Sequence, residues 1–281
     1  MTTVLDTIDK GTRYLESRGI EDARRNMQML VAHQLGLNRI ELYMQFDRPM
    51  QEDELAPLRD MLKKRGQRVP LQHLLGRVEF FNREFICDSR GLIPRPETEE
   101  LVELILKENL PAECDVLDLG TGSGVLGLTL AAELAEKCHQ LTCADISPDA
   151  LALAGENAAE LELDGVEFIH TDLFDQLAGR RFHLIAANLP YVEETDRPSL
   201  TPEVMHDPEL ALFSGADGLD LLRRFCKEAR NYLHPGGIVA LEIGHRQGPA
   251  LESLLLAEGF TNVRVHKDMS GIARFPIAHI D

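Results

Sequence analysis

The feature that most constrains this chain is a glycine-rich turn, DLGTGSG at 118–124, that directly follows an apolar segment. From residue 98 onward, short apolar segments typical of buried strands alternate with segments whose apolar residues recur at helical spacing. This alternation is typical of βαβ units, in which a mostly parallel sheet carries helices on both faces. We therefore predict a doubly wound α/β domain whose ligand lies at the edge where the strands end.

The rest of the chain is organised around this domain. Residues 1–75 contain no convincing strand, and their apolar positions recur at helical spacing, which predicts a small helical domain. Residues 76–96 include β-like pieces within VEFFNREFICD, so we expect a hairpin that links two domains. The α/β domain then spans 97–281, and its last two segments, VRVHKD and RFPIAHI, are expected to pair antiparallel at the sheet edge.

The net charge of the chain limits the kinds of partner that it can bind. Among 281 residues, 29 are Lys or Arg and 47 are Asp or Glu, which gives a formal net charge of −18. This charge opposes broad contact with a phosphate backbone, so we expect no stable binding of nucleic acid, although a local basic patch stays open.

Cysteine usage and hydropathy indicate the compartment. The five cysteines are scattered without paired spacing, which favours reduced thiols in a cytoplasm over a disulfide framework. Neither they nor the ten histidines show metal-ligand spacing, so no metal is expected. No apolar run is long enough for a membrane span or a signal peptide. We therefore expect a cytoplasmic protein without a membrane or metal site.

The glycine-rich turn has the composition of a cofactor site. Gly120 and Gly122 permit positive φ and close approach of a ligand, and Gly124 lets the next helix start close to the strand. Asp118, at the strand end, is placed to meet the amino-acid end of a ligand directly or through water. Asp145, which ends the next strand, is placed to accept both hydroxyls of a ribose.

A third acidic residue could contribute to the same site, and the glycine-rich turn also allows a second class of cofactor. Asp172, after the third strand of the domain, would lie near an adenine edge or else cap a helix, and both readings stay open. The pattern Gly122-x-Gly124-x-x-Gly127 also matches the dinucleotide fingerprint. The carboxylate of Asp118 favours S-adenosylmethionine, because nicotinamide sites do not require an acid at that position.

The fourth strand ends in NLPY, which predicts a site for a planar amino group. The side-chain oxygen of Asn188 and a backbone carbonyl near Leu189 or Pro190 can both accept from one NH₂ group, while Tyr191 stacks on the plane that carries it. No strong base is needed, because a delocalised nitrogen becomes acidic once it is methylated. Alone, NLPY could be only a turn. Placed after DLGTGSG, it favours a methyltransferase.

These motifs resemble a known family. DLGTGSG followed by NLPY looks like the amino-methyltransferases that use S-adenosylmethionine, and LIPRPETE at 92–99 is similar to one branch, the release factor glutamine methyltransferases or HemK family. QHLLGRVEFF, HDPELALFSGADGLDLLRRF and LEIGHRQG add to the likeness, which covers nearly the whole chain. The resemblance implies a Rossmann-like fold with a mostly parallel seven-stranded sheet, a helical N-terminal domain and a linking hairpin.

The resemblance also implies site residues. The S-adenosylmethionine site would comprise Asp118, Gly120, Thr121, Gly122, Ser123, Gly124, Asp145, Asp172, Leu173 and Asn188. The target glutamine would be held by Asn188, Leu189, Pro190 and Tyr191, and Asn188, Pro190 and Tyr191 would form the catalytic group. Two positions depart from the family pattern. Leu189 replaces a frequent proline and leaves its carbonyl in place, whereas Leu173 replaces a frequent aromatic residue and would weaken stacking on adenine.

The implied reaction is methylation of the side-chain amide of the GGQ-motif glutamine in class 1 peptide chain release factors, with the N-terminal domain helping to dock that substrate. A ribosomal protein glutamine methyltransferase is the second reading. Methylation of RNA at adenine N6 is favoured by Leu189 but opposed by the charge, and a cofactor-binding module without catalysis is opposed by Asn188 and Tyr191. Arg95 and Glu97 either pair with each other, cap the following helix or orient the substrate.

Overall fold

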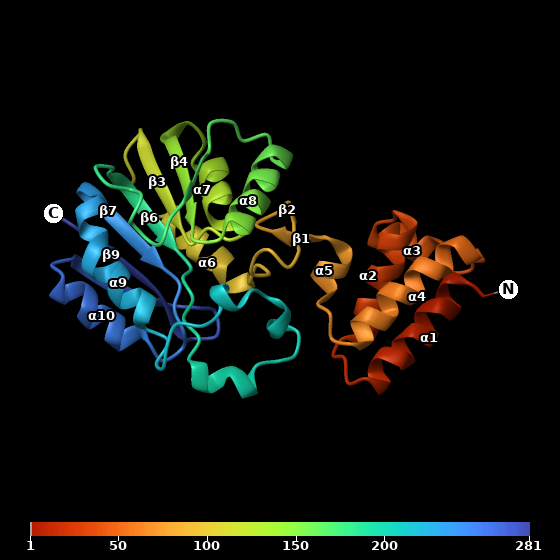
Figure 1. The fold of residues 1–281 in the computed structure, drawn as a ribbon. Coiled ribbons are helices and arrows are strands. Elements are labelled where there is room, and N and C mark those ends of the chain that lie inside the picture. Colours follow the sequence, from red (N-terminus) through yellow and green to blue (C-terminus); the bar gives the residue numbers. More distant parts are fainter. Residues whose placement is uncertain (1) are drawn as a thin grey trace. The chain divides into compact units, whose positions relative to one another are not determined.

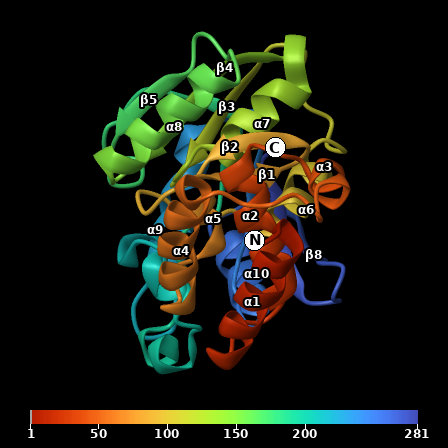
Figure 2. The same cartoon turned by 90° about the vertical axis from the view of Figure 1, so that its right-hand side faces the viewer.

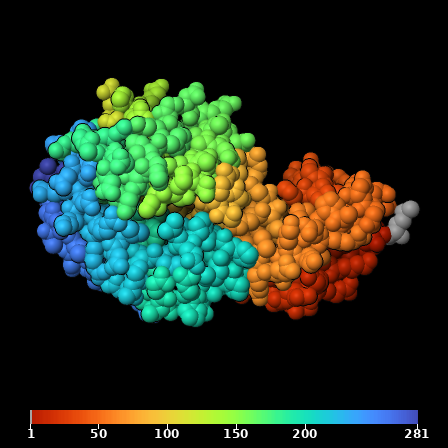
Figure 3. Space-filling view, in the orientation of Figure 1, coloured from red at the N-terminus to blue at the C-terminus, as the bar shows by residue number. Residues whose placement is uncertain are grey.

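The computed structural model describes residues 2–281 and divides them into two compact units. The first comprises residues 2–77 together with Thr201–His206, and the second comprises Val78–Leu200 and Asp207–Asp281. In Figures 1 and 3 residues 2–77 of the first unit run from red to orange and its segment Thr201–His206 is cyan, while the second unit continues through yellow and green to blue. No helix among residues 2–281 has the length and apolar character that crossing a bilayer requires.

The first unit is helical. Its helices α1, α2 and α4 pack on one another (Figure 2) around a core that includes Ile8, Leu15, Met27 and Leu30. The helices are α1 (Val4–Ser17), α2 (Ala23–Leu35), α3 (Arg39–Met44), α4 (Glu52–Gly66) and α5 (Leu71–Leu75). Thr3 and Asn38 cap the starts of α1 and α3 with their side-chain oxygens, which satisfies backbone N–H groups that a helix start leaves unpaired.

The second unit contains a two-stranded hairpin and a seven-stranded sheet. The hairpin strands are β1 (Arg77–Phe80) and β2 (Arg83–Ile86). The sheet strands are β3 (Cys114–Leu119), β4 (Cys138–Asp145), β5 (Glu167–His170), β6 (Phe182–Ala187), β7 (Leu233–Leu241), β8 (Thr261–Lys267) and β9 (Ala273–His279). The helices are α6 (Pro96–Ile105), α7 (Val125–Leu134), α8 (Pro148–Glu160), α9 (Asp220–Ala229) and α10 (Gly248–Ala257), and the short 3₁₀ turns are η1 (Ala135–Lys137), η2 (Glu194–Ser199), η4 (Glu209–Ala211) and η5 (Arg230–Tyr232). A further 3₁₀ turn, η3 (Val204–His206), belongs to the first unit.

The strand order is β5-β4-β3-β6-β7-β9-β8, parallel throughout except that β9 runs antiparallel to both β7 and β8. This confirms the predicted α/β fold class and the antiparallel pair at the sheet edge. The point between β3 and β6 is where the strand order reverses direction, and the ligands of such sheets bind beside it.

Both faces of the sheet are covered, as its apolar strands require. Successive residues of a strand point to opposite faces, so Val116 belongs to the core under α6, α7 and α8, and Leu117 to the core under α9 and α10. Figure 1 shows these two layers of helices on either side of the sheet. Polar residues at the carboxyl ends of the strands therefore face one layer or the other according to their position in the alternation.

The segment Thr201–His206 belongs to the helical unit although it lies far along the chain. Arg65, at the end of α4, is buried, and donates from Nε to Asn26 Oδ1 at 2.8 Å and from Nη1 to Glu203 Oε1 at 3.0 Å. Arg68 donates to the same Glu203 oxygen at 3.2 Å. Arg65 and Arg68, at the end of α4 and just after it, therefore anchor this returning segment.

We expect Glu203→Gln to loosen the returning segment. Burial acts to raise the pKa of Glu203, but the hydrogen bonds from Arg65 and Arg68 outweigh burial and hold the pKa below its ordinary value of 4.5. Its stabilisation is therefore complete above pH 4.5 and is lost as the pH falls through the lower folded pKa. The substitution should cost about 1–3 kcal/mol of local stability, measured as faster proteolytic cleavage between residues 193 and 208.

The matched control is Glu194→Gln, because the Glu194–Arg197 pair is exposed and should contribute little. Equal cleavage rates in the two variants would show that Glu203 does not anchor the segment.

Candidate active site

A cavity of about 340 Å³ lies at the carboxyl ends of β3, β4, β5 and β6 in the second unit. Most residues predicted from the sequence line it, namely Asp118, Gly120, Thr121, Gly122, Ser123, Asp145, Asp172, Leu173, Asn188, Leu189 and Pro190. Gly124 and Tyr191 do not line it. The parallel sheet brings the lining residues together because the ends of neighbouring strands meet at one edge.

The glycine-rich turn has the backbone conformation that the sequence suggested. Gly120 and Gly122 have φ values of 73° and 56°, a region that other residues rarely adopt. A Cβ on Gly122 would meet nothing within 4 Å, whereas one on Gly120 would lie 2.9 Å from the Leu189 side chain. We expected Gly124 to bring the helix start close to the strand. A Cβ at Gly124 would instead crowd Leu128 of α7 and Ala154 of α8, so the absence of a side chain lets α7 approach α8.

Asp118 holds this turn in place. Its side chain is buried, and Oδ2 accepts hydrogen bonds from Thr121 Oγ1 at 2.6 Å and from the Gly127 N–H at 2.9 Å. Burial raises the pKa of Asp118 to about 6, with a smaller contribution from the charge of Asp145, while the two hydrogen bonds act to lower it. A positively charged group in the cavity would therefore favour the ionised carboxylate.

Asp145 is tied to the same turn. Its Oδ2 accepts from the Gly122 N–H at 2.9 Å and its Oδ1 from the Ser147 N–H at 2.8 Å. Burial raises the pKa of Asp145 above its ordinary value, although these backbone hydrogen bonds oppose the shift. A carboxylate has about four acceptor sites, so capacity remains for hydroxyl groups of a ligand.

Two residues that line the cavity follow β5, which is the third strand of the sheet along the chain. Asp172 forms an ion pair with Arg224 at 3.1 Å, a partner on α9 that the sequence did not suggest. Leu173 has a φ of 48°, which is strained for a residue with a branched aliphatic side chain, and it is largely buried in the cavity wall. Strained backbone of this kind is common at ligand sites, where the surrounding structure enforces it.

A second buried carboxylate connects NLPY to the start of α6. Glu242, which follows β7 and is 1% exposed, accepts from Thr98 Oγ1 at 2.7 Å and from the Tyr191 hydroxyl at 3.3 Å. The Asn188 Nδ2 group donates to the same Thr98 Oγ1 at 3.4 Å. Burial raises the pKa of both Glu242 and Tyr191. The side-chain nitrogen of Asn188 therefore already donates a hydrogen bond within the protein.

The sequence analysis did not identify Thr98 or Glu242 as site residues. Both lie within stretches that carried the resemblance, PRPETE and LEIG, and that was the available signal. For Arg95 three readings were open, and its partner is Asp207, at 2.7 Å, rather than Glu97. Asp207 Oδ1 also accepts from the Ile93 N–H at 3.3 Å, so this ion pair ties the residues after NLPY to PRPETE.

Comparison with known proteins agrees with these features. The PrmC N-terminal domain family matches residues 6–76, and the methyltransferase small domain family matches residues 98–217. A release factor glutamine methyltransferase of Deinococcus radiodurans is 41% identical over 96% of both chains. Another, from Geobacter sulfurreducens, is 37% identical over 97% of this chain and 95% of its own length. The chain belongs to the release factor glutamine methyltransferase family.

Solved structures show the same fold at low identity. A methyltransferase from Pyrococcus furiosus aligns with a TM-score of 0.52 and 19% identity over 71% of this chain and 90% of its own. The 16S rRNA N2 G1207 methyltransferase of Thermus thermophilus, solved with AdoMet and guanosine, aligns with a TM-score of 0.52 and 19% identity over 73% of this chain and 50% of its own. These likenesses show that the second unit has the fold of these methyltransferases.

We expect Gly127→Ala to disturb the turn through Asp118. A Cβ at Gly127 would lie 2.7 Å from Asp118 Cβ and 2.8 Å from its Oδ2, so the carboxylate must move away from its two donors. Overpacking should lower the free energy of unfolding by about 1–3 kcal/mol, measured by urea denaturation.

The matched control is Gly155→Ala in α8, where an added Cβ meets nothing within 4 Å. That substitution should raise stability by about 0.4–1 kcal/mol, because alanine restricts the unfolded chain. Similar gains in both variants would mean that Asp118 is not held against α7.

Proposed function

We propose that this protein methylates the side-chain amide nitrogen of the GGQ-motif glutamine in class 1 peptide chain release factors, with S-adenosylmethionine as methyl donor. The observation that carries the proposal is the orientation of Asn188. Because its Nδ2 donates to Thr98, its Oδ1 is the atom left to accept from a ligand at the cavity that Asn188 lines. One side-chain oxygen and the backbone carbonyl at Leu189 or Pro190 match the two hydrogens of a carboxamide NH₂.

The cavity fits the donor. Its volume of about 340 Å³ is within the range of small-molecule sites, and the open space at Gly122 allows a ligand to approach the backbone. Asp118 and Asp145, which are held by a hydroxyl and by backbone N–H groups, line it, so this part of the wall suits a ligand that carries positive charge. Asp172 also lines the cavity, but its charge is paired with Arg224. When bound, S-adenosylmethionine supplies an electrophilic methyl group on a sulfonium sulfur.

The protein's own part in the reaction is to bind and orient. The turn at 120–124 and Asp145 would hold the donor, with Asp118 near its amino-acid end and Asp172 and Leu173 near the adenine. Asn188 and the neighbouring carbonyl would hold the amide nitrogen in line with the methyl group. Tyr191, which follows this lining but is not part of it, would pack on the amide plane once the acceptor is bound. No base is required before methyl transfer, since the nitrogen releases its proton once it has been alkylated. Positioning therefore accounts for most of the rate.

We assign docking of the release factor to the helical unit. On α3 the side chains of Ile40, Tyr43 and Met44 are exposed, by 71%, 44% and 75%. Large apolar side chains gathered on one short helix are typical of a protein-binding surface. The names of the relatives that share both units support a release factor as the partner.

Other acceptors are less well supported. A ribosomal protein glutamine would fit the same amide site, but PRPETE at 94–99 favours the release factor branch. An RNA adenine presents a similar planar NH₂ group, but a net charge of −18 opposes binding to a polyanion.

The proposal predicts transfer of label from S-adenosylmethionine to a release factor and not to ribosomal RNA or ribosomal proteins. The test is incubation with methyl-labelled donor and each acceptor, followed by peptide mapping of the label to the GGQ glutamine. Changing that glutamine to alanine should abolish incorporation. Label found only in RNA or in a ribosomal protein would overturn the assignment. In the same assay Asn188→Ala should remove turnover while leaving donor binding largely in place.

Thr98→Val should lower kcat about tenfold or more, with little change in the dissociation constant for S-adenosylmethionine. Valine keeps the shape of threonine but cannot accept from Asn188 or donate to Glu242, so the Asn188 amide is free to rotate. Thr98→Ser retains the hydroxyl and should restore most of the rate. Equal rates for the valine and serine variants would show that this hydroxyl does not orient Asn188.

A further inference from the structure

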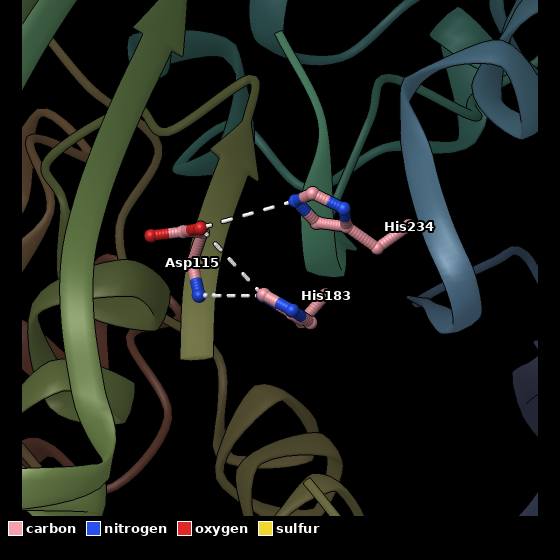
Figure 4. Close-up of side chains that lie close together, drawn as sticks. All are labelled: Asp115, His183 and His234. Carbon is pink, nitrogen blue, oxygen red and sulfur yellow. Dashed lines mark hydrogen bonds and ion pairs between the residues drawn. The ribbon is translucent and has the colours of Figure 1, made fainter. Parts of the chain in front are cut away.

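A second cluster of polar side chains lies at the other end of the sheet, where β3, β6 and β7 begin. Asp115, His183 and His234 are each the second residue of their strand, and these strands are neighbours in the order β3-β6-β7. Figure 4 shows the three side chains converging from the three strands. The cofactor cavity lies at the opposite, carboxyl ends of the strands, so the proposed methyl transfer does not use this cluster.

The side-chain atoms of the cluster lie at spacings that one ion could bridge. Asp115 Oδ2 lies 3.7 Å from His183 Nδ1 and 4.0 Å from His234 Nε2, both too long for a hydrogen bond. Each residue offers one ligand atom within 4.8 Å of the other two. Around a tetrahedral zinc ion with ligands at about 2.0–2.2 Å, neighbouring ligand atoms lie about 3.3–3.6 Å apart, so side-chain rotations would bring the three atoms into range.

The protonation state of His183 and the arrangement of the two imidazole rings also suit metal binding. His183 Nδ1 accepts a hydrogen bond from the Asp115 backbone N–H at 3.1 Å, so that nitrogen is unprotonated, as a metal ligand must be. Ion binding would exchange this hydrogen bond for a metal bond at the same lone pair. The rings of His183 and His234 stack with centroids 4.3 Å apart, which holds both imidazoles beside the carboxylate.

A fourth residue orients the carboxylate. His139 Nδ1 lies 2.9 Å from Asp115 Oδ1, the oxygen that does not face the other two histidines. Such contacts to the free atom of a metal-binding side chain fix its orientation. The ligand side chains of Asp115, His183 and His234 are 28%, 26% and 37% exposed, so an ion can enter from solvent and keep water as a further ligand.

We propose that Asp115, His183 and His234 form a Zn²⁺ site that joins the starts of three strands. Two imidazole nitrogens and one carboxylate are ligands that zinc prefers, whereas Mg²⁺ and Ca²⁺ prefer oxygen ligands alone. The site lies at the end of the sheet away from the cavity, so its part is in the stability of the sheet and not in the proposed methyl transfer. Its residues are separated by 68 and 51 positions in the chain, so spacing in the sequence could not reveal it.

The test uses the full chain after treatment with a chelator. Titration with ZnCl₂ in a calorimeter should show one equivalent bound, and zinc should raise the melting temperature. The double variant His183→Gln/His234→Gln should bind at least tenfold more weakly and lose the thermal shift. His33→Gln, at an exposed histidine of the helical unit, is the matched control and should bind as the unmodified protein does.

A second measurement does not depend on how the variants fold. Co²⁺ added to the unmodified protein should give the visible absorption of a low-symmetry nitrogen and oxygen site, and Zn²⁺ should displace it. Failure to bind an equivalent of Zn²⁺, binding that survives in the double variant, or equal affinity for Mg²⁺ would overturn the proposal. Loss of methyl transfer has no bearing on it, since binding and thermal stability are the quantities measured.

Discussion

The buried carboxylate of Asp118 is the interaction on which the glycine-rich turn and the cavity beside it depend. Its Oδ2 accepts from a side chain in the glycine-rich turn and from the first turn of α7, so one oxygen joins strand, turn and helix. Burying a carboxylate is costly unless it is hydrogen-bonded, and the raised pKa of Asp118 reflects that cost. The close fit at Gly127 follows from the same constraint, because any larger residue would displace the carboxylate.

Glu242 has a comparable part beside NLPY. Asp118, Asn188 and Glu242 each lie two positions after a residue of the core under α6, α7 and α8, so all three point toward that layer. Those core residues are Val116, Ala186 and Ala240. Asp118 meets α7, and Glu242 and Asn188 meet Thr98 on α6. The period of two in a strand therefore explains why the polar groups of three separate strands face one layer of helices.

The two ends of the sheet differ in the polar side chains that they bring together. The carboxyl ends hold acids that are satisfied by backbone N–H groups of turns, which leaves room for a ligand above them. The starts of β3, β6 and β7 instead collect an acid and two histidines that satisfy one another only in part. A parallel sheet creates both groups, because every strand begins at one edge and ends at the other.

By itself the sequence determined the α/β alternation, the antiparallel last pair and the position of the glycine-rich turn, because these depend on local periodicity and on residue types at short spacing. It also placed Asp118, Asp145 and Asn188 at strand ends, from which their meeting at one edge follows. Only the tertiary structure decided that Asp118 bonds to Gly127, that Thr98 and Glu242 join Asn188, and that Arg95 pairs with Asp207. The same holds for the return of Thr201–His206 to the helical unit and for the cluster around Asp115. These contacts join residues whose separation is set by strand order and packing, and neither can be read from the spacing of residues along the chain.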